Sequence, residues 1–398
     1  MSSFPLGTFP LAGIRVVSLE QAVGGPLCTR HLADLGADVI KIERPGEGDL
    51  ARYYDSVVHG ESSYFVWLNH GKRSAALDLK SEADRATLDD LLETTDVLVS
   101  NLGPGAADRL GLGWVPLHER WPRLISCAIS GYGADGPYRD RKAFDLLIQG
   151  ESGLLEVQGT PDTPVKSTIP IADIAAGVYA LSSILAALYE RERTGLGRFI
   201  DISMLDCLAE WMMVPAYYQQ YTGKPPARSG ARHNTLVPYG PYRVADGQSV
   251  NLAIQTQAQW DRLCRQVLER PDLVEDPRYQ TMELRVLNRS VLEPLIESLF
   301  AGQTRTEVEA RLQAADVPFG SLNTVADLLI HPQLEARNRW FSVDTPSGPA
   351  LALDHPLNIA GLPRRLGPVP ALGASTAELR RSLSDKEPSA VQDRSVES

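Results

Sequence analysis

Residues 14–43 read IRVVSLEQAVGGPLCTRHLADLGADVIKIE, and the fold class follows from the pattern in this segment. Ile14–Leu19 is an apolar run typical of a buried strand. Gly24-Gly25-Pro26 comes next, and its proline suits the first position of a helix. The predicted helix continues to about Leu35, and Ala37–Glu43 predicts a second strand. Because a strand, a helix and a strand in this order imply a parallel pair, we expect an α/β fold.

Apolar runs and helical segments continue to alternate through the first half of the chain. We expect further strands at Tyr64–Asn69, Ser74–Asp78, Val97–Ser100, Leu124–Ile129 and Phe199–Ser203, and helices at Ser81–Glu93, before Leu110, at Phe144–Gly153, after Asp173 and around Trp211. Thr222–Gly230, with the sequence TGKPPARSG, is the strongest linker signal. Beyond it the pattern indicates a smaller α+β domain, with a hairpin of Tyr242–Val244 and Val250–Ile254 and helices at 257–268, 290–301 and 304–315. A second hairpin is predicted at Trp340–Leu353. From Ser384 onward we expect a polar, disordered tail.

Composition limits the possible partners and the compartment. The 398 residues carry a net charge of −11, which argues against nucleic acid or an anionic membrane as a partner. The four cysteines are widely spaced and form no CxxC pair, so we expect free thiols, no structural zinc and a cytoplasmic location. No apolar run precedes Arg15 to suggest a signal peptide, and Ile174–Tyr189 is too short to span a bilayer.

The segment Pro170–Glu190, PIADIAAGVYALSSILAALYE, is apolar nearly all round and predicts a buried helix. Asp173 is its only charge before Glu190, and it lies at the helix entrance, where free N–H groups and the helix dipole favour a carboxylate. One interpretation is a helix cap worth about 1 kcal/mol. The other is a nucleophile kept ionised for attack on an acyl carbon.

Other motifs are less specific. The turn after the first strand lacks GxGxxG, which argues against a dinucleotide, and no GxSxG nucleophile elbow is present. Cations at several turns, namely Lys72, Arg73, Arg109 and Lys142, would converge at the carboxyl edge of one sheet and could hold a multiply phosphorylated nucleotide. His233 is the one histidine in a segment rich in glycine and proline, where a structural role competes with a catalytic one.

A set of motifs in fixed order resembles the class III coenzyme A transferases, the family of formyl-CoA:oxalate and carnitine CoA-transferases. The resemblance covers about residues 10–375. It is carried by Pro10–Val17, Gly25–Thr29, Leu35–Asp49, Asn69–Ser74, Asn101–Gly105, Gly131-Tyr-Gly133 and Ile171–Gly177.

The resemblance implies a large Rossmann-like domain (residues 1–222), a small inserted α+β domain (223–335), a return to the large domain (336–398) and an interlocked, ring-like homodimer. It implies that Asp173 attacks an acyl-CoA thioester to give a mixed anhydride and then an aspartyl-CoA thioester, which an acceptor acid resolves. CoA is then a substrate, and no metal or permanently bound cofactor is expected. The CoA contacts carried over are Ala22, Arg44, Lys72, Asn101, Leu102, Arg109, Leu110, Lys142, Phe144 and Met204.

Departures from the family pattern bear on the substrate and on the competing functions. Val23 stands where the formyl-CoA enzyme has an assisting glutamine, and the glycine-rich loop of that enzyme is missing, so oxalate and formyl-CoA are not expected as substrates. Phe144 stands where the related α-methylacyl-CoA racemases carry their histidine base, which disfavours racemisation. A non-catalytic CoA-binding protein is the remaining alternative.

The segment around Tyr239 is similar to that of relatives handling dicarboxylates. Arginine can bind a second carboxylate through a fork of donors, so the expected acceptor contacts are Arg228, Arg232 and His233. We therefore expect succinyl-CoA as the donor and a C4–C6 dicarboxylate as the acceptor, with itaconate or mesaconate first.

Overall fold

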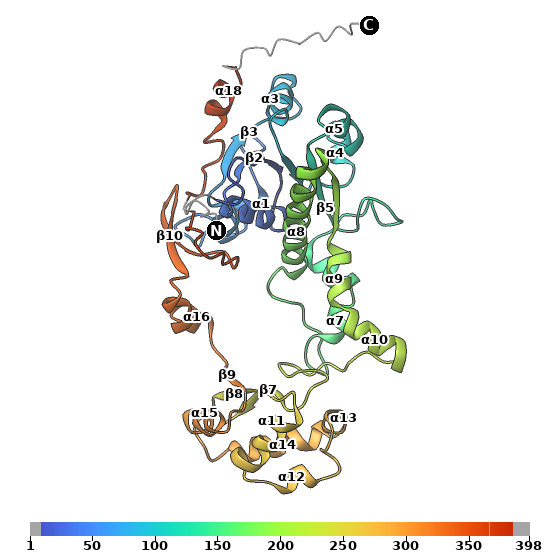
Figure 1. Ribbon diagram of the computed structural model, residues 1–398, viewed down its shortest axis with the longest axis vertical. Helices are drawn as coiled ribbons and strands as arrows, with labels where there is room; N and C mark the ends of the chain where they lie inside the picture. The colour runs from blue at the N-terminus through green and yellow to red at the C-terminus, as the bar shows by residue number, and fades with distance from the viewer. Residues whose placement is uncertain (1–8, 366, 385–398) are drawn as a thin grey trace. The chain divides into compact units, whose positions relative to one another are not determined.

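The computed structural model describes residues 9–365 and 367–384 (Figure 1). They divide into two compact units. The first takes in the described residues up to Ser152, Ser167–Trp211 and those from Ala336 onward, and the second takes in Gly153–Lys166 and Met212–Glu335. The second unit therefore also contains residues that lie before position 222.

The first unit is built on a six-stranded sheet in the order β3-β2-β1-β4-β5-β6, in which every neighbouring pair is parallel. Its strands are β1 (Arg15–Leu19), β2 (Asp38–Glu43), β3 (Arg73–Ala76), β4 (Val97–Ser100), β5 (Ile125–Ser130) and β6 (Phe199–Ser203). The expected α/β class and parallel sheet are confirmed. The strand order reverses between β1 and β4, and ligands of open α/β sheets bind at such a switch point.

Helices cover both faces of this sheet, which is why its strands are apolar on both sides. On β1, Val16 belongs to the core under α1 (Gly24–Asp34) and α8 (Ile171–Thr194), and Val17 belongs to the opposite core. Helices α3 (Glu82–Leu92), α5 (Trp114–Arg120) and α18 (Thr376–Ser384) contribute leucines to that second core. Short helices complete this unit: α4 (Ala106–Arg109), α6 (Asp145–Glu151), α9 (Met204–Trp211) and the 3-10 turn η1 (Leu50–Tyr53).

One predicted strand is wrong. Tyr64–Asn69 lies in helix α2 (Ser63–Asn69). Phe65 and Val66 are buried, Trp67 is exposed, and Leu68 and Asn69 are buried again, which is a helical rather than an alternating pattern. A six-residue apolar run is too short for periodicity alone to separate a helix from a strand.

Helix α8 is 24 residues long and apolar enough, by length and composition, to cross a membrane. Its small residues Ala172, Ala175, Ala176, Gly177 and Ala180 are buried, and it packs against α1, α9 and the β5–β6 edge of the sheet. These contacts are those of a core helix, as the sequence predicted.

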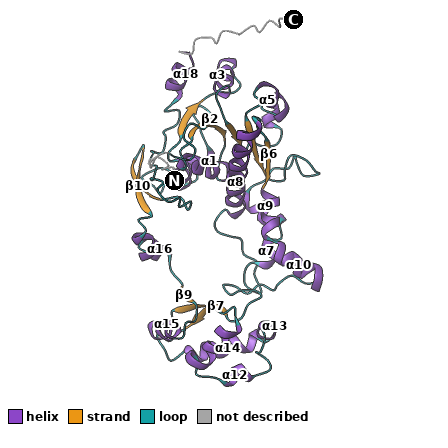
Figure 2. Ribbon diagram, viewed as in Figure 1, coloured by secondary structure: helices purple, strands orange, loops and turns teal. Residues whose placement is uncertain are grey.

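The second unit holds a three-stranded antiparallel sheet, β7 (Tyr239–Arg243), β8 (Ser249–Ala253) and β9 (Phe319–Ser321), so the expected β7–β8 hairpin is confirmed. Figure 2 shows helices gathered around this small sheet. They include α11 (Gln257–Arg262), the π-turn η2 (Leu263–Val267), α12 (Asp272–Glu275), α13 (Met282–Leu287), α14 (Arg289–Phe300) and α15 (Arg305–Ala314). Helices α7 (Leu154–Val157), α10 (Met213–Thr222), α16 (Val325–Leu329) and α17 (Pro332–Ala336) are shorter or peripheral.

The chain beyond the second unit forms the predicted second hairpin, β10 (Trp340–Thr345) with β11 (Gly348–Leu353). The tail predicted to be disordered lies, after Ser384, outside the described residues. All four cysteines are free thiols, as expected, and the structure buries each of them.

Candidate active site

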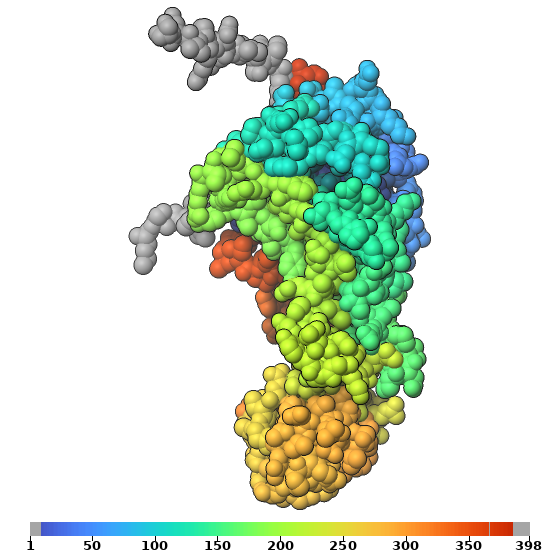
Figure 3. Space-filling view, turned by 90° about the vertical axis from the view of Figure 1, so that its right-hand side faces the viewer, coloured from blue at the N-terminus to red at the C-terminus, as the bar shows by residue number. Residues whose placement is uncertain are grey.

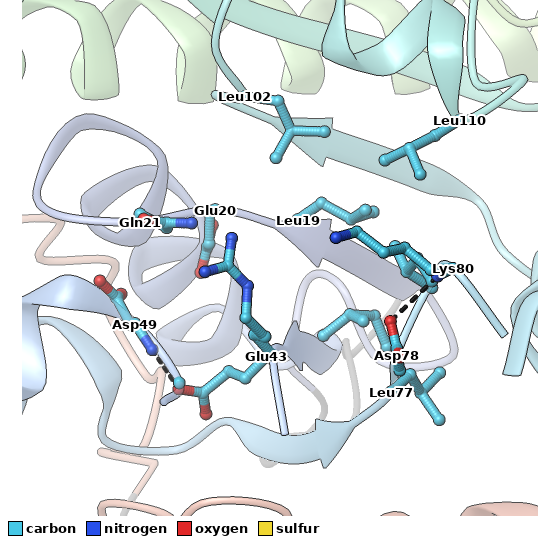
Figure 4. A pocket seen from close by; sticks show the side chains of 14 residues that line it. Leu19, Glu20, Gln21, Glu43, Asp49, Leu77, Asp78, Lys80, Leu102 and Leu110 are labelled. Carbon is cyan, nitrogen blue, oxygen red and sulfur yellow. Dashed lines mark hydrogen bonds between the residues drawn. The ribbon is translucent and has the colours of Figure 1, made fainter. Parts of the chain in front are cut away.

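A pocket opens at the switch point of the large sheet, where the carboxyl ends of four neighbouring strands meet. It is lined by the ends of β1 (Leu19, Glu20, Gln21) and β2 (Ile42, Glu43, Arg44), by Gly48 and Asp49, by the turn after β3 (Leu77, Asp78, Leu79, Lys80), and by Leu102 and Leu110 after β4. Figure 4 shows Leu102 and Leu110 on one side of the pocket and Leu77 with Asp78 on the other. The pocket is therefore built from loops that four separate βα units supply.

The lining combines apolar walls with exposed cations. Six of its fourteen lining residues are leucine or isoleucine, four are acidic, and Arg44 and Lys80 are exposed at its rim. Arg44 Nη1 lies 2.5 Å from Glu47 Oε2 in an ion pair, and the side chain of each partner is 69% exposed. A flat apolar ring carrying phosphates matches this chemistry, because the ring can stack between aliphatic walls and surface cations can meet the charge.

The loop that leads from this pocket to α1 is clamped by side chains of other strands. Asn101 Oδ1 accepts the N–H of Gln21 at 2.8 Å, and Asn101 Nδ2 donates to the Gln21 carbonyl at 2.7 Å. Asp49 Oδ1 accepts the N–H of Ala22 at 3.0 Å. Ala22 has φ 61°, in the left-handed region that non-glycine residues seldom adopt, so these bonds hold a strained turn.

Two residues beyond that turn, the backbone N–H of Gly24 faces the carboxylate of Asp173 and lowers its pKa. Gly24 is the first residue of α1, and Asp173 lies in the first turn of α8. Gln21 lines the pocket, so one short backbone segment connects the pocket to this carboxylate.

Asp173 does not cap its own helix. The N-cap of α8 is Pro170, which makes no side-chain capping bond. Asp145, the first residue of α6, supplies that bond instead, because its Oδ1 accepts the N–H of Ala172 at 2.8 Å. The carboxylate of Asp173 is therefore free for a role other than capping.

The environment of Asp173 makes its carboxylate unusually basic. Its pKa is raised to about 7, first by burial and then by the negative charge of Asp145, whereas the Gly24 N–H acts in the opposite direction. The ionised form of Asp173 is therefore less favoured in the folded protein than in a free aspartate. A partly buried carboxylate with such a pKa has the properties of a functional group.

Aromatic and apolar side chains border this carboxylate. The phenol of Tyr54 follows η1, and its pKa is raised by burial and by the charges of Asp49 and Asp173. Its ring makes an edge-to-face contact with Tyr64, with 5.5 Å between ring centroids. Next to them lies a small apolar cluster that consists of Val23, Leu27 and Leu68 with Tyr64 and Ile174 packed against it. Apolar and aromatic side chains therefore pack beside the first turn of α8.

Beneath the pocket lies a fully buried charge network. Lys72 Nζ donates to Glu20 Oε1 at 2.8 Å, to the Pro26 carbonyl at 3.0 Å and to Asn69 Oδ1 at 3.0 Å. Lys41 Nζ donates to Asp49 Oδ2 at 2.7 Å. All three hydrogens of Lys72 are therefore used inside the protein, and this lysine supports the pocket floor without lining it.

The structure distributes the remaining predicted CoA contacts as follows. Arg44, Leu102 and Leu110 line the pocket, and Ala22 and Asn101 belong to the clamped turn beside it. Arg109 is exposed next to Leu110, and Lys142 and Phe144 are exposed just before α6, with Phe144 66% accessible. Met204 is buried at the start of α9.

The predicted acceptor contacts are all engaged within the second unit. Arg228 donates to the carbonyls of Thr160, Glu156 and Pro161. Arg232 is paired with Glu293 and Glu297, and the ring of His233 lies 5.0 Å from that of Tyr239. Their binding of a substrate carboxylate therefore stays a prediction, which these internal bonds do not favour.

Sequence reasoning missed several residues that the structure brings to the site: Gly24, Tyr54, Leu77–Lys80 and Asp145. The turn after β3 could have been found, because it follows a strand of the same parallel sheet. Tyr54 and Asp145 carry no local signal, since only the tertiary fold places them near Asp173.

Comparison with known proteins decides the family. The profile of CoA-transferase family III matches residues 11–376. The chain belongs to this family. It is accordingly an enzyme of the transferase class, and the resemblance to the class III CoA-transferases is confirmed.

Relatives of this family III enzyme support the coarse reaction. Acetyl-CoA:oxalate CoA-transferase of Acetobacter aceti is 35% identical over 95% of this chain and 97% of its own length. Succinyl-CoA:glutarate CoA-transferase of Mus musculus is 34% identical over 82% of this chain and 74% of its own length. Succinyl-CoA:mesaconate CoA-transferase of Haloarcula hispanica is 34% identical over 93% and 95%, respectively. The acids in these three names are all dicarboxylates.

The fold is shared with solved members of the family. A crystal structure of a CAIB/BAIF family protein from Brucella suis aligns with a TM-score of 0.81 at 35% identity, covering 94% of this chain and 99% of that one. The similarity thus extends over nearly the whole of both chains.

Proposed function

We propose that this family III enzyme transfers CoA from an acyl-CoA donor to a small dicarboxylic acid through covalent intermediates on Asp173. One observation carries the proposal: a partly buried carboxylate of raised pKa, which the Gly24 N–H faces at the end of a backbone segment that begins in the pocket. Arg44 and Lys80 at the pocket rim suit the phosphates of CoA, and the aliphatic walls suit its adenine.

The reaction needs four acyl transfers and no net proton transfer. An oxygen of Asp173 attacks the thioester carbon, the C–S bond breaks, and CoA leaves as a thiolate. The thiolate attacks the aspartyl carbonyl and releases the donor acid, which leaves an aspartyl-CoA thioester. The acceptor carboxylate then displaces the thiolate from the aspartyl carbonyl to form a second anhydride. Finally the thiolate takes the acceptor acyl group and frees Asp173.

The surroundings of Asp173 suit this chemistry. An anhydride is hydrolysed if water reaches it, and the Tyr54–Tyr64 pair with the adjoining apolar cluster restricts water on the carboxylate side. A basic carboxylate is also the better nucleophile toward a thioester carbonyl. The group that the fold provides is therefore ionisable at neutral pH and shielded at the same time.

For the substrates, we propose succinyl-CoA as the donor and a C4–C6 dicarboxylate as the acceptor. Mesaconate and itaconate are the acceptors that we propose to test before the others. The names of the glutarate and mesaconate relatives support this choice. The relative named for oxalate is as similar as the others, so oxalate belongs in the panel although the sequence argued against it. Racemisation is not favoured, because the charged partner of Asp173 is Asp145 and Phe144 occupies the position of the base.

The proposal includes a homodimer. Helix α10 exposes Met213, Val214, Tyr217, Tyr218 and Tyr221, which repeat at a helical spacing on one side. Figure 3 faces this part of the molecule, with residues near 215 in yellow-green. An exposed apolar and aromatic stripe of this kind is typical of a protein interface. Light scattering coupled to size-exclusion chromatography should therefore give twice the chain mass.

The deciding experiment is mass spectrometry of the intact protein mixed with succinyl-CoA. We expect an added succinyl or CoA mass on the wild type and none on Asp173→Asn. A panel of oxalate, glutarate, itaconate, mesaconate and acetate then identifies the acceptor class. Turnover with acetate alone would remove the dicarboxylate assignment, and an adduct on Asp173→Asn would remove the nucleophile. Unchanged succinyl-CoA with every acid would favour a CoA-binding protein without catalysis.

A further inference from the structure

A second carboxylate stands beside the proposed nucleophile. Asp145 Oδ1 accepts the Ala172 N–H at 2.8 Å, one residue before Asp173, and its Oδ2 accepts from Gln149 Nε2 at 2.7 Å. Gln149 is fully buried, and its Oε1 accepts the Ser167 N–H at 2.8 Å. The Asp145 carboxylate is therefore fixed by a chain of bonds that runs from α6 to the segment preceding α8.

Two carboxylates meet at the entrance of α8. The first turn of α8 contains Asp173, and its capping acceptor is a second negative charge brought from another helix. A serine, threonine or asparagine would cap the helix without adding charge. Since two carboxylates close together disfavour double ionisation, the choice of aspartate at position 145 opposes ionisation of Asp173.

Other groups around Asp173 do not offset this repulsion with a positive charge. Within the described residues, the groups that act on its carboxylate are Asp145 from α6, the Gly24 N–H from α1 and the phenol of Tyr54 after η1. The buried Lys72 is paired with Glu20. Asp145 is thus the charged neighbour that adds to the effect of burial in raising the basicity of Asp173.

We propose that Asp145 is a positioning residue that fixes the entrance of α8 and, by repulsion, makes Asp173 a more basic nucleophile whose acylation relieves that repulsion. The inference rests on the proposed function. When an oxygen of Asp173 bonds to the acyl carbon and the electron pair of the C–S bond leaves with the CoA sulfur, the negative charge departs from the carboxylate pair. The repulsion present in the free enzyme is then lost, which favours the aspartyl intermediates.

The test is the pH dependence of adduct formation with succinyl-CoA, followed from pH 5 to 9 by rapid quench and intact-protein mass spectrometry. At subsaturating succinyl-CoA the profile reports groups of the free enzyme. We expect the wild-type rate to rise with pH and to level off above about 7, the pKa of Asp173. In Asp145→Asn the midpoint should fall by at least about one pH unit, and the plateau rate should fall several-fold.

Two further variants separate charge from structure. Asp145→Glu keeps the charge and should keep a midpoint near that of the wild type. In Asp145→Asn the new side-chain amide can turn an N–H toward Gln149 Nε2, which is itself a donor. Asp145→Ser is therefore the second neutral variant, since its hydroxyl is shorter and can accept as well as donate, so it does not force a donor against Gln149. A merely structural role would lower the plateau in all three variants and leave the midpoint unchanged.

The outcomes distinguish this inference from the proposed function. A midpoint in Asp145→Asn or Asp145→Ser that equals the wild-type value would overturn the role of Asp145 while adducts on Asp173 still form. If the wild type forms no adduct, or if Asp173→Asn forms the same adduct, then Asp173 is not the nucleophile. A lower midpoint in the neutral variants, together with the wild-type value in Asp145→Glu, supports the assignment.

Discussion

The backbone N–H of Gly24 faces the carboxylate of Asp173 and lowers its pKa, although 149 positions separate the two residues in the chain. The contact exists because α1 and α8 pack closely at their first turns. A Cβ at Gly24 would lie 3.3 Å from the Asp173 carbonyl oxygen, and one at Gly177 would lie 2.7 Å from the Gly24 carbonyl oxygen. Two glycines thus set the separation of the helices that meet at the site.

Gly177→Ala should therefore damage both stability and activity. The added methyl group meets a backbone oxygen and Leu27, which cannot move aside without separating α1 from α8. We expect the free energy of unfolding to fall by about 1–3 kcal/mol despite the better helix propensity of alanine. Because the Gly24–Asp173 contact lengthens, the rate of adduct formation should also fall at least about tenfold.

Ser182→Ala is the matched control for that change, since Ser182 lies on the exposed side of the same helix. Its stability, measured by urea unfolding, should stay within about 0.5 kcal/mol of the wild type. Wild-type rates in Gly177→Ala would show that close packing of the two helices is not needed at the site.

Asp173→Asn should abolish transfer and stabilise the fold at alkaline pH. The pKa of Asp173 is raised from 3.8 to about 7, so the folded protein holds this proton more tightly than the unfolded chain. The favourable contribution of the protonated group is complete below pH 3.8 and is lost as the pH rises through about 7. Relative to the wild type, Asp173→Asn should thus gain roughly 2–4 kcal/mol at about pH 8.5 and little at about pH 3.5.

Thermal and urea unfolding of both proteins across this pH range provide the measurement. The same gain at both pH values would mean that ionisation of Asp173 is not destabilising. We expect the variant to be more stable only at high pH and to lose transfer activity. This combination is expected when an ionisable carboxylate destabilises the fold but is needed for activity.

Lys72→Met and Lys80→Met should fail in different ways. Lys72 is buried with Glu20, so its loss leaves a buried carboxylate with only Lys41 nearby and should lower the free energy of unfolding by about 2–4 kcal/mol. Lys80 is exposed at the pocket rim, so its loss should leave stability unchanged and raise KM for the acyl-CoA about two- to fivefold.

Lys224→Met, an exposed change in the second unit, controls for the loss of one surface charge. Steady-state kinetics at low and high salt separate the two effects, since a contact with CoA phosphates weakens as salt is added. If Lys72→Met raised KM without loss of stability, Lys72 would contact CoA directly, as the resemblance implied.

Arg232→Met should destabilise the second unit and leave KM for the acceptor unchanged. Glu293, whose side chain is 7% exposed, would lose its partner 2.9 Å away, which should cost roughly 2–4 kcal/mol. The nearby Arg243→Met removes an exposed cation and serves as the control. A rise in KM for the acid with unchanged stability would instead support the sequence-based assignment of Arg232 to the substrate.

The sequence alone determined the features that depend on local pattern. Apolar runs predicted all six strands of the large sheet to within a few residues, and Pro170–Glu190 predicted the core helix, because burial on both faces leaves a continuous apolar signal. Asp173 stood out for the same reason, as the single charge in that run. The ordered motifs then identified the family, which the profile over residues 11–376 confirms.

Only the tertiary structure decided which side chains surround that carboxylate and which predicted contacts are free. Tyr54, Asp145 and Gly24 come from separate elements, and no spacing in the chain relates them to Asp173. Lys72 reads as a cation at a turn, but packing makes it the buried partner of Glu20. The physical reason is that secondary structure follows from neighbours along the chain, whereas pKa, burial and hydrogen-bond partners follow from neighbours in space.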